Sequence, residues 1–252
     1  MDDLLIVLSN PNDGRHDAFN DWYSNIHIRD VMRLPGSSAV QRLRRVDASV
    51  GEGQGIVADQ VFEYLAVYEC HDIERLSAGH GPVFTPMMLI SDSFSFAMRE
   101  AYYTPHVSRQ RASAAIHEGD YVLERIAVTA DPDFVAWYDE VRMPTLMALP
   151  GVVSGTFASV SSHQMLQPHA DSHHVALYRT QDRAGTLAGW GSAPVLPGGL
   201  TAQVACYTPL IPRWTAGQVV HPSAEGRAAE ARARVALGDR VHRGFPSELG
   251  AS

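Results

Sequence analysis

Three polar side chains near the amino terminus have the spacing of an acid–base site. Tyr23 and His27 are four residues apart, and His27 and Asp30 are three apart, so a continuous helix would place all three on one side. A carboxylate beside an imidazole suits a general acid or base near neutral pH, and a tyrosine hydroxyl would stabilise a developing oxyanion. The alternative is structural: Trp22 and Tyr23 pack on a sheet while His27 satisfies a local hydrogen bond.

Further residues are candidates for holding a substrate. Arg142 suits a carboxylate or phenolate, unless it pairs at the surface with Asp139 or Glu140. His80 lies in a segment that would either line a cavity mouth or form a solvated loop. Aromatic side chains at alternate strand positions are either core or the wall of a pocket for a planar, mostly apolar molecule. These are Tyr64, Tyr68 and Phe96.

No cofactor or metal is predicted. All 20 basic residues are arginine, and without lysine the chain lacks the amine for a Schiff base, enzyme-linked pyridoxal phosphate or a P-loop. A dinucleotide-binding glycine motif is missing after the predicted strands. Four histidines form a group without the cysteine or glutamate pattern of a zinc site. They are His163, His169, His173 and His174.

The composition is that of a soluble globular protein. A net charge of -8 without a basic tract argues against nucleic acid as a partner. No apolar run approaches the roughly 18 residues of a membrane span, so no membrane association is predicted. Cys70 and Cys206 lie in strand-like runs, and we expect two unpaired core thiols in a cytoplasmic protein.

The elements that would position these residues occur twice. Residues 19–36 align with residues 134–151, which superposes Trp22-Tyr23 on Trp137-Tyr138 and matches the Leu-Pro-Gly that ends each segment. Each unit has the order strand, helix, strand, strand, helix, strand, which is typical of a ferredoxin-like fold. We predict an α+β fold made by tandem duplication of this unit. Its two four-stranded antiparallel sheets would pack face to face as an α+β barrel.

The repeat also sets the predicted boundaries. These are 1–105 for the first unit, 106–120 for a connector, 121–214 for the second unit and 215–252 for a C-terminal arm. The arm has too few large apolar residues for a core, so we expect it to be peripheral. The bare sheet faces would cover each other, and His27 would project into an enclosed hollow between them.

A resemblance to the dimeric α+β-barrel superfamily, and within it to the EthD-like proteins, is carried by four motifs. They are Trp22-Tyr23, His27, Asp30 and Leu34-Pro35-Gly36. The resemblance implies a site at His27 in the first unit only, because Arg142 and Thr145 occupy the matching positions of the second. Relatives include decarboxylases, dehydratases, cyclases, isomerases, cofactorless monooxygenases and haem proteins. The fold alone therefore does not determine the reaction.

We therefore expect a cofactor-independent enzyme that acts on a small aromatic or polyketide-like compound. His27, assisted by Asp30, would move a proton next to a carbonyl, followed by loss of water or carbon dioxide or by isomerisation. A haem-dependent or cofactorless oxygenase of the same fold is the second hypothesis, and a non-catalytic binding module is the third. A small-molecule substrate is the expected partner, with a homodimer left open.

Overall fold

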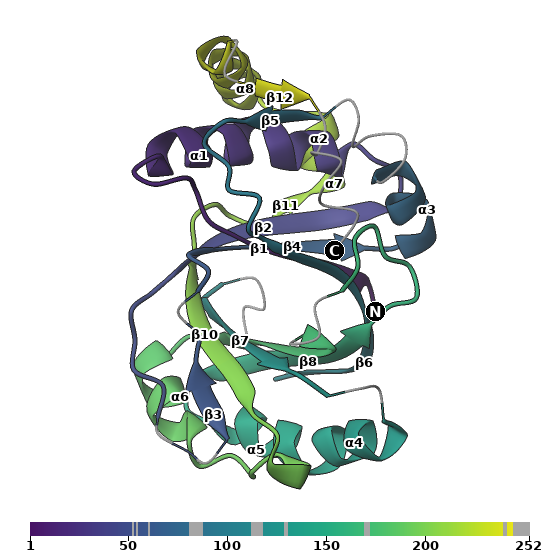
Figure 1. Cartoon of the computed structure of the whole chain (residues 1–252), viewed down its shortest axis with the longest axis vertical. Coiled ribbons are helices and arrows are strands. Elements are labelled where there is room, and N and C mark those ends of the chain that lie inside the picture. Colours follow the sequence, from purple (N-terminus) through teal and green to yellow (C-terminus); the bar gives the residue numbers. More distant parts are fainter. Residues whose placement is uncertain are drawn as a thin grey trace.

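In the computed structural model of this chain, helices cover both outer sides of a central β structure (Figure 1). It describes residues 1–51, 53, 55–59, 61–80, 88–111, 118–128, 131–168 and 172–238, and the backbone of 241–243. Among these residues, none of the helices is long and apolar enough to cross a membrane.

Within the described part of the chain, eight antiparallel strands close into one barrel. Its order is β2, β4, β1, β6, β8, β9, β7, β10 and back to β2. The strands are β1 (Asp3–Ser9), β2 (Ser37–Arg45), β4 (Tyr64–Cys70), β6 (Arg99–Gln110), β7 (Asp120–Ile126), β8 (Val152–Val160), β9 (His174–Thr180) and β10 (Ala202–Pro209). A short strand, β3 (Ile56–Ala58), extends the sheet beside β10.

The two halves of the barrel have the same strand order. In each half the strands lie in the spatial order second, third, first and fourth. The predicted barrel is confirmed, and pairing of β6 with β8 and of β10 with β2 joins its two halves. β6 continues to Gln110, so the first part of the expected connector 106–120 is strand. The ferredoxin-like duplication itself stays an interpretation.

The repeated segments form helices on the outer faces, and each contains one π-helical turn. They are α1 (His16–Trp22), η1 (Tyr23–His27) and α2 (Ile28–Met32), and α4 (Pro132–Trp137), η4 (Tyr138–Arg142) and α5 (Met143–Ala148). After them, Gly36 and Gly151 have positive φ angles of 99° and 75°. A Cβ on Gly36 would lie 2.2 Å from the Asp72 carbonyl oxygen, so only glycine fits. Shorter helices are α3 (Ile73–Ala78), α6 (Arg183–Trp190) and η6 (Pro197–Gly199).

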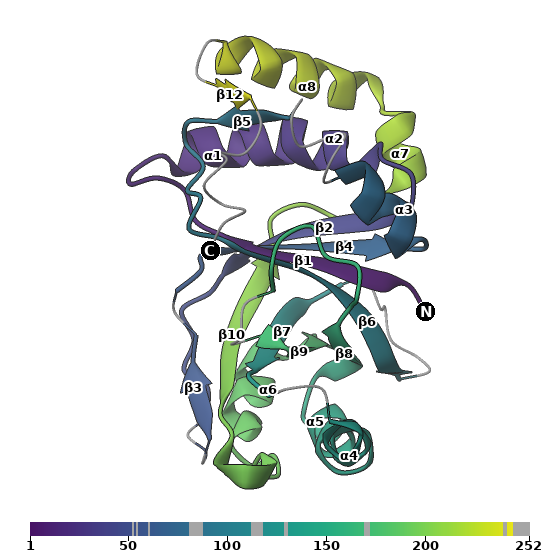
Figure 2. The same cartoon turned by 45° about the vertical axis from the view of Figure 1, so that its right-hand side comes forward.

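The C-terminal segment packs on the outer side of the first-half helices, and the predicted division of the chain into two units and an arm stays a prediction. α8 (Ala224–Leu237) lies along α1 and η1 and buries Ala233 and Leu237 (Figure 2). Alanine on the contact face lets two helices approach closely, so few large side chains are needed. The segment also contributes β11 (Trp214–Thr215) beside β2, α7 (Ala216–Val220), and β12 (Val241–Arg243) beside β5 (Leu89–Ser91).

The middle of the barrel is filled by apolar side chains. They include Leu4, Ile6, Leu8, Leu43, Leu65 and Val67. Tyr64 and Tyr68 lie on the opposite face of β4, in the core that the first-half helices cover, and His27 belongs to those helices. The prediction that His27 projects into a hollow between the sheets is therefore wrong, whereas Tyr64 and Tyr68 belong to the core, which was one of the two alternatives for them. Cys70 and Cys206 are buried and unpaired, as expected.

Candidate functional site

Polar side chains gather between the first-half helices and the outer face of the barrel. η1 supplies two of them, and the others come from β2, β4, β6 and the end of α3. The π-helical turn, closed by a hydrogen bond from Ile28 N–H to the Tyr23 carbonyl, is a feature often found at functional sites. We call this group the first-half cluster: Tyr23, His27, Arg42, Tyr68, His80, Glu100 and Tyr102.

His27 is held as a neutral imidazole. Burial, followed by the nearby His80 and Arg42, lowers its pKa to about 3. Its ring stacks on Trp22 with centroids 4.9 Å apart and meets the edge of Tyr23 at 4.7 Å. The Nδ1 atom is buried and has no hydrogen-bond partner among the described residues. A buried polar atom without a partner is costly, so this atom is suited to contact a ligand.

Asp30 does not contact His27, and the expected acid–base pair is wrong. The Asp30 carboxylate pairs instead with Arg234 at 2.7 Å and with Arg33 at 3.0 Å. Burial raises the pKa of Asp30, while Arg234 opposes that shift. Arg234 and Glu230 of α8 lie against Asp30, so this carboxylate faces α8 rather than the cluster.

His80 is buried in the cluster and does not lie in a solvated loop. It is 2% exposed, and its Nδ1 lies 3.0 Å from the Tyr102 hydroxyl. Burial lowers the pKa of His80 to about 4, so this second imidazole is also neutral at physiological pH. The next residues, 81–87, lie outside the described part of the chain.

We expect the protein to lose stability in acid because of His27. Its folded-state pKa of about 3 lies below the ordinary value of 6.5, so between these values the unfolded chain binds a proton that the folded chain does not. The free energy of unfolding should fall by roughly 1 kcal/mol per pH unit below pH 6.5 relative to a His27→Gln variant, which cannot titrate there. Urea unfolding of both proteins at pH 7, 5.5 and 4.5 measures this. If the difference in unfolding free energy between the two proteins is the same at all three pH values, the lowered pKa of His27 is contradicted.

Arg42 is a buried cation that the sequence analysis missed. Its guanidinium is 1% exposed, lies 4.4 Å from the Tyr23 ring centroid, and donates to Ser24 Oγ at 2.7 Å and Asn20 Oδ1 at 2.8 Å. No described carboxylate pairs with it. Burial lowers the pKa of Arg42 to about 10, so it still carries its charge at neutral pH. The available sequence signal was weak: Arg42 stands two residues after Val40, so in a strand both side chains share one face.

Two further buried hydroxyls of the cluster, those of Tyr23 and Tyr68, lie close to each other. The hydroxyls of Tyr23 and Tyr68 are buried and make no hydrogen bond of normal geometry to any described residue. Burial raises the pKa of Tyr23 to about 12 and that of Tyr68 well above its usual value, with Arg42 opposing both shifts. Both therefore stay protonated and can donate a hydrogen bond.

The remaining predicted residues lie around this group. The Tyr64 hydroxyl accepts a hydrogen bond from Asn20 at 3.0 Å, so it has a partner at the margin of the cluster. Phe96 packs on the same core and meets Phe94 edge to face at 5.3 Å. Glu100 is a further buried member, and burial raises its pKa to about 8. Glu100 is thus neutral at pH 7 and does not balance the Arg42 charge.

In the second half, the equivalent polar groups satisfy one another. Arg142 is 1% exposed and forms an ion pair with Glu124. The Tyr138 hydroxyl donates to Glu124 Oε2 at 2.6 Å and lies 3.0 Å from the Tyr178 hydroxyl. The alternative of a surface pair with Asp139 or Glu140 is wrong for Arg142, and its predicted contact with substrate stays a prediction.

The strand register explains why the halves differ. Val7 and Arg42 lie opposite Ala66 in the first half, and Glu124 and Phe157 lie opposite Ala176 in the second. The second half therefore has a carboxylate where the first has valine, and an aromatic ring where the first has a cation. Consequently, the first-half cluster retains a positive charge and unpaired polar atoms. In its counterpart the charges balance, and the equivalent polar groups pair with one another.

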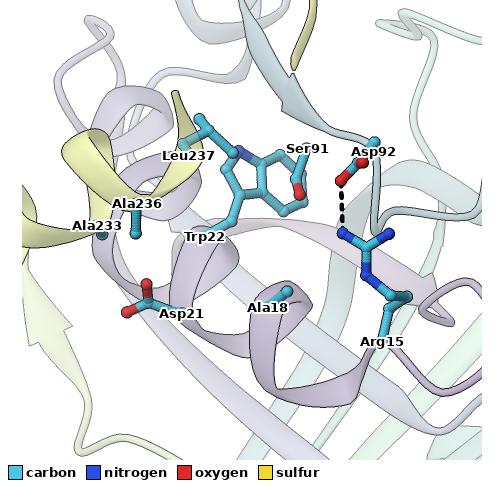
Figure 3. Close-up of a pocket in the computed structure, with 9 residues that line it drawn as sticks. All are labelled: Arg15, Ala18, Asp21, Trp22, Ser91, Asp92, Ala233, Ala236 and Leu237. Carbon is cyan, nitrogen blue, oxygen red and sulfur yellow. Dashed lines mark hydrogen bonds and ion pairs between the residues drawn. The ribbon is translucent and has the colours of Figure 1, made fainter. Parts of the chain in front are cut away.

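A surface cleft of about 100 Å³ reaches Trp22, whose indole stacks on His27. Figure 3 shows this indole between Leu237 of α8 and Ser91 of β5. The Trp22 Nε1 donates to the Leu89 carbonyl at 2.8 Å, which fixes the ring. Trp22 thus lies between the cleft and the His27 imidazole and contacts both.

Metal ligation by the histidines between 163 and 174 finds no geometric support in the described residues. No group of three or more potential ligands is close enough to hold a metal ion there. His174 is buried and its Nδ1 lies 2.6 Å from Ser159 Oγ. His169 lies outside the described residues.

Sequence comparisons match this chain to no protein family and to no curated protein. Structure comparison does find likenesses. An anthrone oxidase-like protein matches with a TM-score of 0.57 and 12% identity over 86% of this chain and 94% of that chain. A candidate monooxygenase from Fusobacterium nucleatum matches with a TM-score of 0.50 and 9% identity over 83% and 93%. Likeness at this identity shows the fold alone. The chain therefore shares its fold with these two proteins, and the resemblance to dimeric α+β-barrel and EthD-like proteins stays a prediction.

Proposed function

We propose that this protein is an oxygenase that needs no external reductant and oxidises an electron-rich aromatic ketone of the anthrone type. One observation carries the proposal: a buried Arg42 without a carboxylate partner lies among unpaired polar atoms of Tyr23, His27 and Tyr68. A buried cation without a counter-ion favours an anionic ligand, such as an enolate or phenolate. The names of the similar structures are consistent with this class of reaction.

The proposed chemistry uses the neutral His27 as proton acceptor. Its Nδ1 takes a proton from a methylene group between two aromatic rings, and Arg42 with the tyrosine hydroxyls stabilises the enolate oxygen. The anion formed beside the ring offsets the burial that lowers the pKa of His27. The carbanion donates its electrons to molecular oxygen, a carbon–oxygen bond forms, and the hydroperoxide loses water to give a carbonyl. The methylene carbon and O₂ yield one ketone and one water, so the electrons balance.

This proposal replaces the lyase that we expected from the sequence, which the comparisons do not support. It retains one working half and one structural half. The repeat in 19–36 and 134–151, together with the common strand order, supports our interpretation that both halves are ferredoxin-like duplicates. We infer that the first half is the working one, because Val7 and His27 stand there at the positions that Glu124 and Arg142 occupy in the second half.

The test is oxygen uptake with anthrone as the substrate. We expect one O₂ consumed per quinone formed, without added reductant, and a loss of roughly 100-fold or more in kcat for His27→Gln. The matched control is His106→Gln, whose imidazole lies outside the cluster against Ser159. Turnover without O₂ would favour a lyase, and a Soret band in the purified protein would favour the haem alternative. Full activity of His27→Gln would refute the assigned base.

We further propose that substrate enters through the cleft at Trp22. Ala18 lines this cleft from α1, and an Ala18→Trp side chain would fill it. We expect kcat/KM for anthrone to fall by about tenfold or more because access is slowed. Ala228→Trp, on the exposed face of α8, serves as the control. Equal kinetics for both variants would show that the substrate enters elsewhere.

A further inference from the structure

One end of the barrel interior contains a cavity that is separate from the first-half cluster. It has a volume of about 290 Å³ and lies between the two halves, on the inner face of the strands. Its lining combines apolar and polar side chains, including Leu4, Val67, Leu177, Ser108, Tyr121 and Arg179. The first-half cluster lies on the outer face of the same barrel, so the sheet separates the two places.

Arg179 is the buried charge of this cavity. It is 8% exposed, its Nη2 donates to the Tyr121 hydroxyl, and that hydroxyl donates to Gln41 Oε1 at 2.7 Å. The Nη1 atom is buried and has no hydrogen-bond partner among the described residues. Burial lowers the pKa of Arg179 to about 10, which leaves it charged at neutral pH. A guanidinium in this position still has a donor that no described group satisfies.

No neighbouring carboxylate in the described part of the chain forms an ion pair with Arg179. Glu69 also lines the cavity and its charge favours the charged form of Arg179, but Glu69 is paired with Arg213, whose Nε donates to Glu69 Oε1 at 2.7 Å. Arg109 pairs with Asp139. Asp2 also lines the cavity but forms no ion pair with Arg179 in this structure. A buried cation without a bonded carboxylate is unfavourable unless an anion joins it.

We propose that this cavity binds a small carboxylate with an apolar body. The carboxylate accepts from Arg179 Nη1, and the apolar body lies against Leu4, Val67 and Leu177. Charge-assisted bonds from arginine to carboxylate are among the stronger polar contacts, and a mixed apolar and polar lining is typical of ligand pockets. The site goes beyond the proposed oxygenase reaction and does not depend on it.

Calorimetric titration of the full chain with benzoate and with benzamide tests this site. The two probes have the same shape, but only benzoate is charged, so we expect benzoate to bind at least about tenfold more tightly. Arg179→Met should remove that preference. Arg109→Met, which changes a partly exposed and already paired cation of the same lining, should retain it. Equal binding of both probes, no binding of benzoate, or an unchanged preference in Arg179→Met would overturn the proposal.

Two further variants assign the binding to this cavity. Arg42→Met removes the cation of the first-half cluster and should retain the benzoate preference. Loss of the preference there would assign benzoate to that cluster instead and overturn the proposal. If Arg179→Met does not fold, Leu177→Trp fills the cavity and should abolish benzoate binding. Oxygen uptake with anthrone should be unchanged in Leu177→Trp, so the two proposals succeed or fail separately.

Discussion

Replacing Arg42 with methionine should lower kcat/KM for anthrone by about 100-fold or more, while the protein unfolds at the same or a higher urea concentration. The guanidinium is the cation assigned to the enolate oxygen, so its removal leaves the developing charge without its main partner. Stability should not suffer, because burial already disfavours the charge of Arg42, as its lowered pKa of about 10 shows. Methionine keeps the apolar contact with the Tyr23 ring.

The control for this variant is Arg29→Met. Arg29 is also a buried guanidinium above an aromatic ring, 4.6 Å from the centroid of Trp214, but it lies outside the first-half cluster. We expect its kcat/KM to stay within about threefold of the wild type. Arg42→Lys, which keeps a cation without the planar fork, should recover part of the activity. Full turnover of Arg42→Met, or a loss of the same size in Arg29→Met, would contradict the role of Arg42.

The sequence was sufficient to predict the elements of the fold that local chemistry determines. The repeated segments end at Gly36 and Gly151, whose positive φ angles and close neighbours require glycine. Strand and helix order followed from the change between two-residue and helical periodicity. The barrel itself was expected from the need to cover a bare sheet face, and pairing of β10 with β2 closes it.

The location of the site depended on information that periodicity does not contain. Alternation divides a strand into two faces but does not say which one meets the helices, so the sequence left open whether Tyr68 is a core residue or part of a pocket wall. Asp30 pairs with Arg234 of α8, which is 204 residues distant in sequence, so local spacing could not predict that contact. Arg42 was missed because an arginine in a strand is ordinarily solvated, and only the absence of a paired carboxylate makes it unusual.

Replacing Glu124 with glutamine should destabilise the protein by about 3–5 kcal/mol. The change leaves Arg142 as a buried cation without its counter-ion and weakens the short hydrogen bond from Tyr138. Both charged residues are almost fully buried, so water cannot replace the lost contact. Urea unfolding monitored by tryptophan fluorescence measures the loss. A decrease below about 1 kcal/mol would show that the pair has no structural role.

Replacing both members of this pair separates structure from catalysis. Glu124→Leu combined with Arg142→Met removes both charges, and we expect it to recover most of the lost stability because neither buried ion remains to be balanced. The double variant should also oxidise anthrone at the wild-type rate, since the acting groups all belong to the first half. Loss of turnover in a stable double variant would mean that Arg142 contacts the substrate. Both halves would then contribute residues to the same reaction.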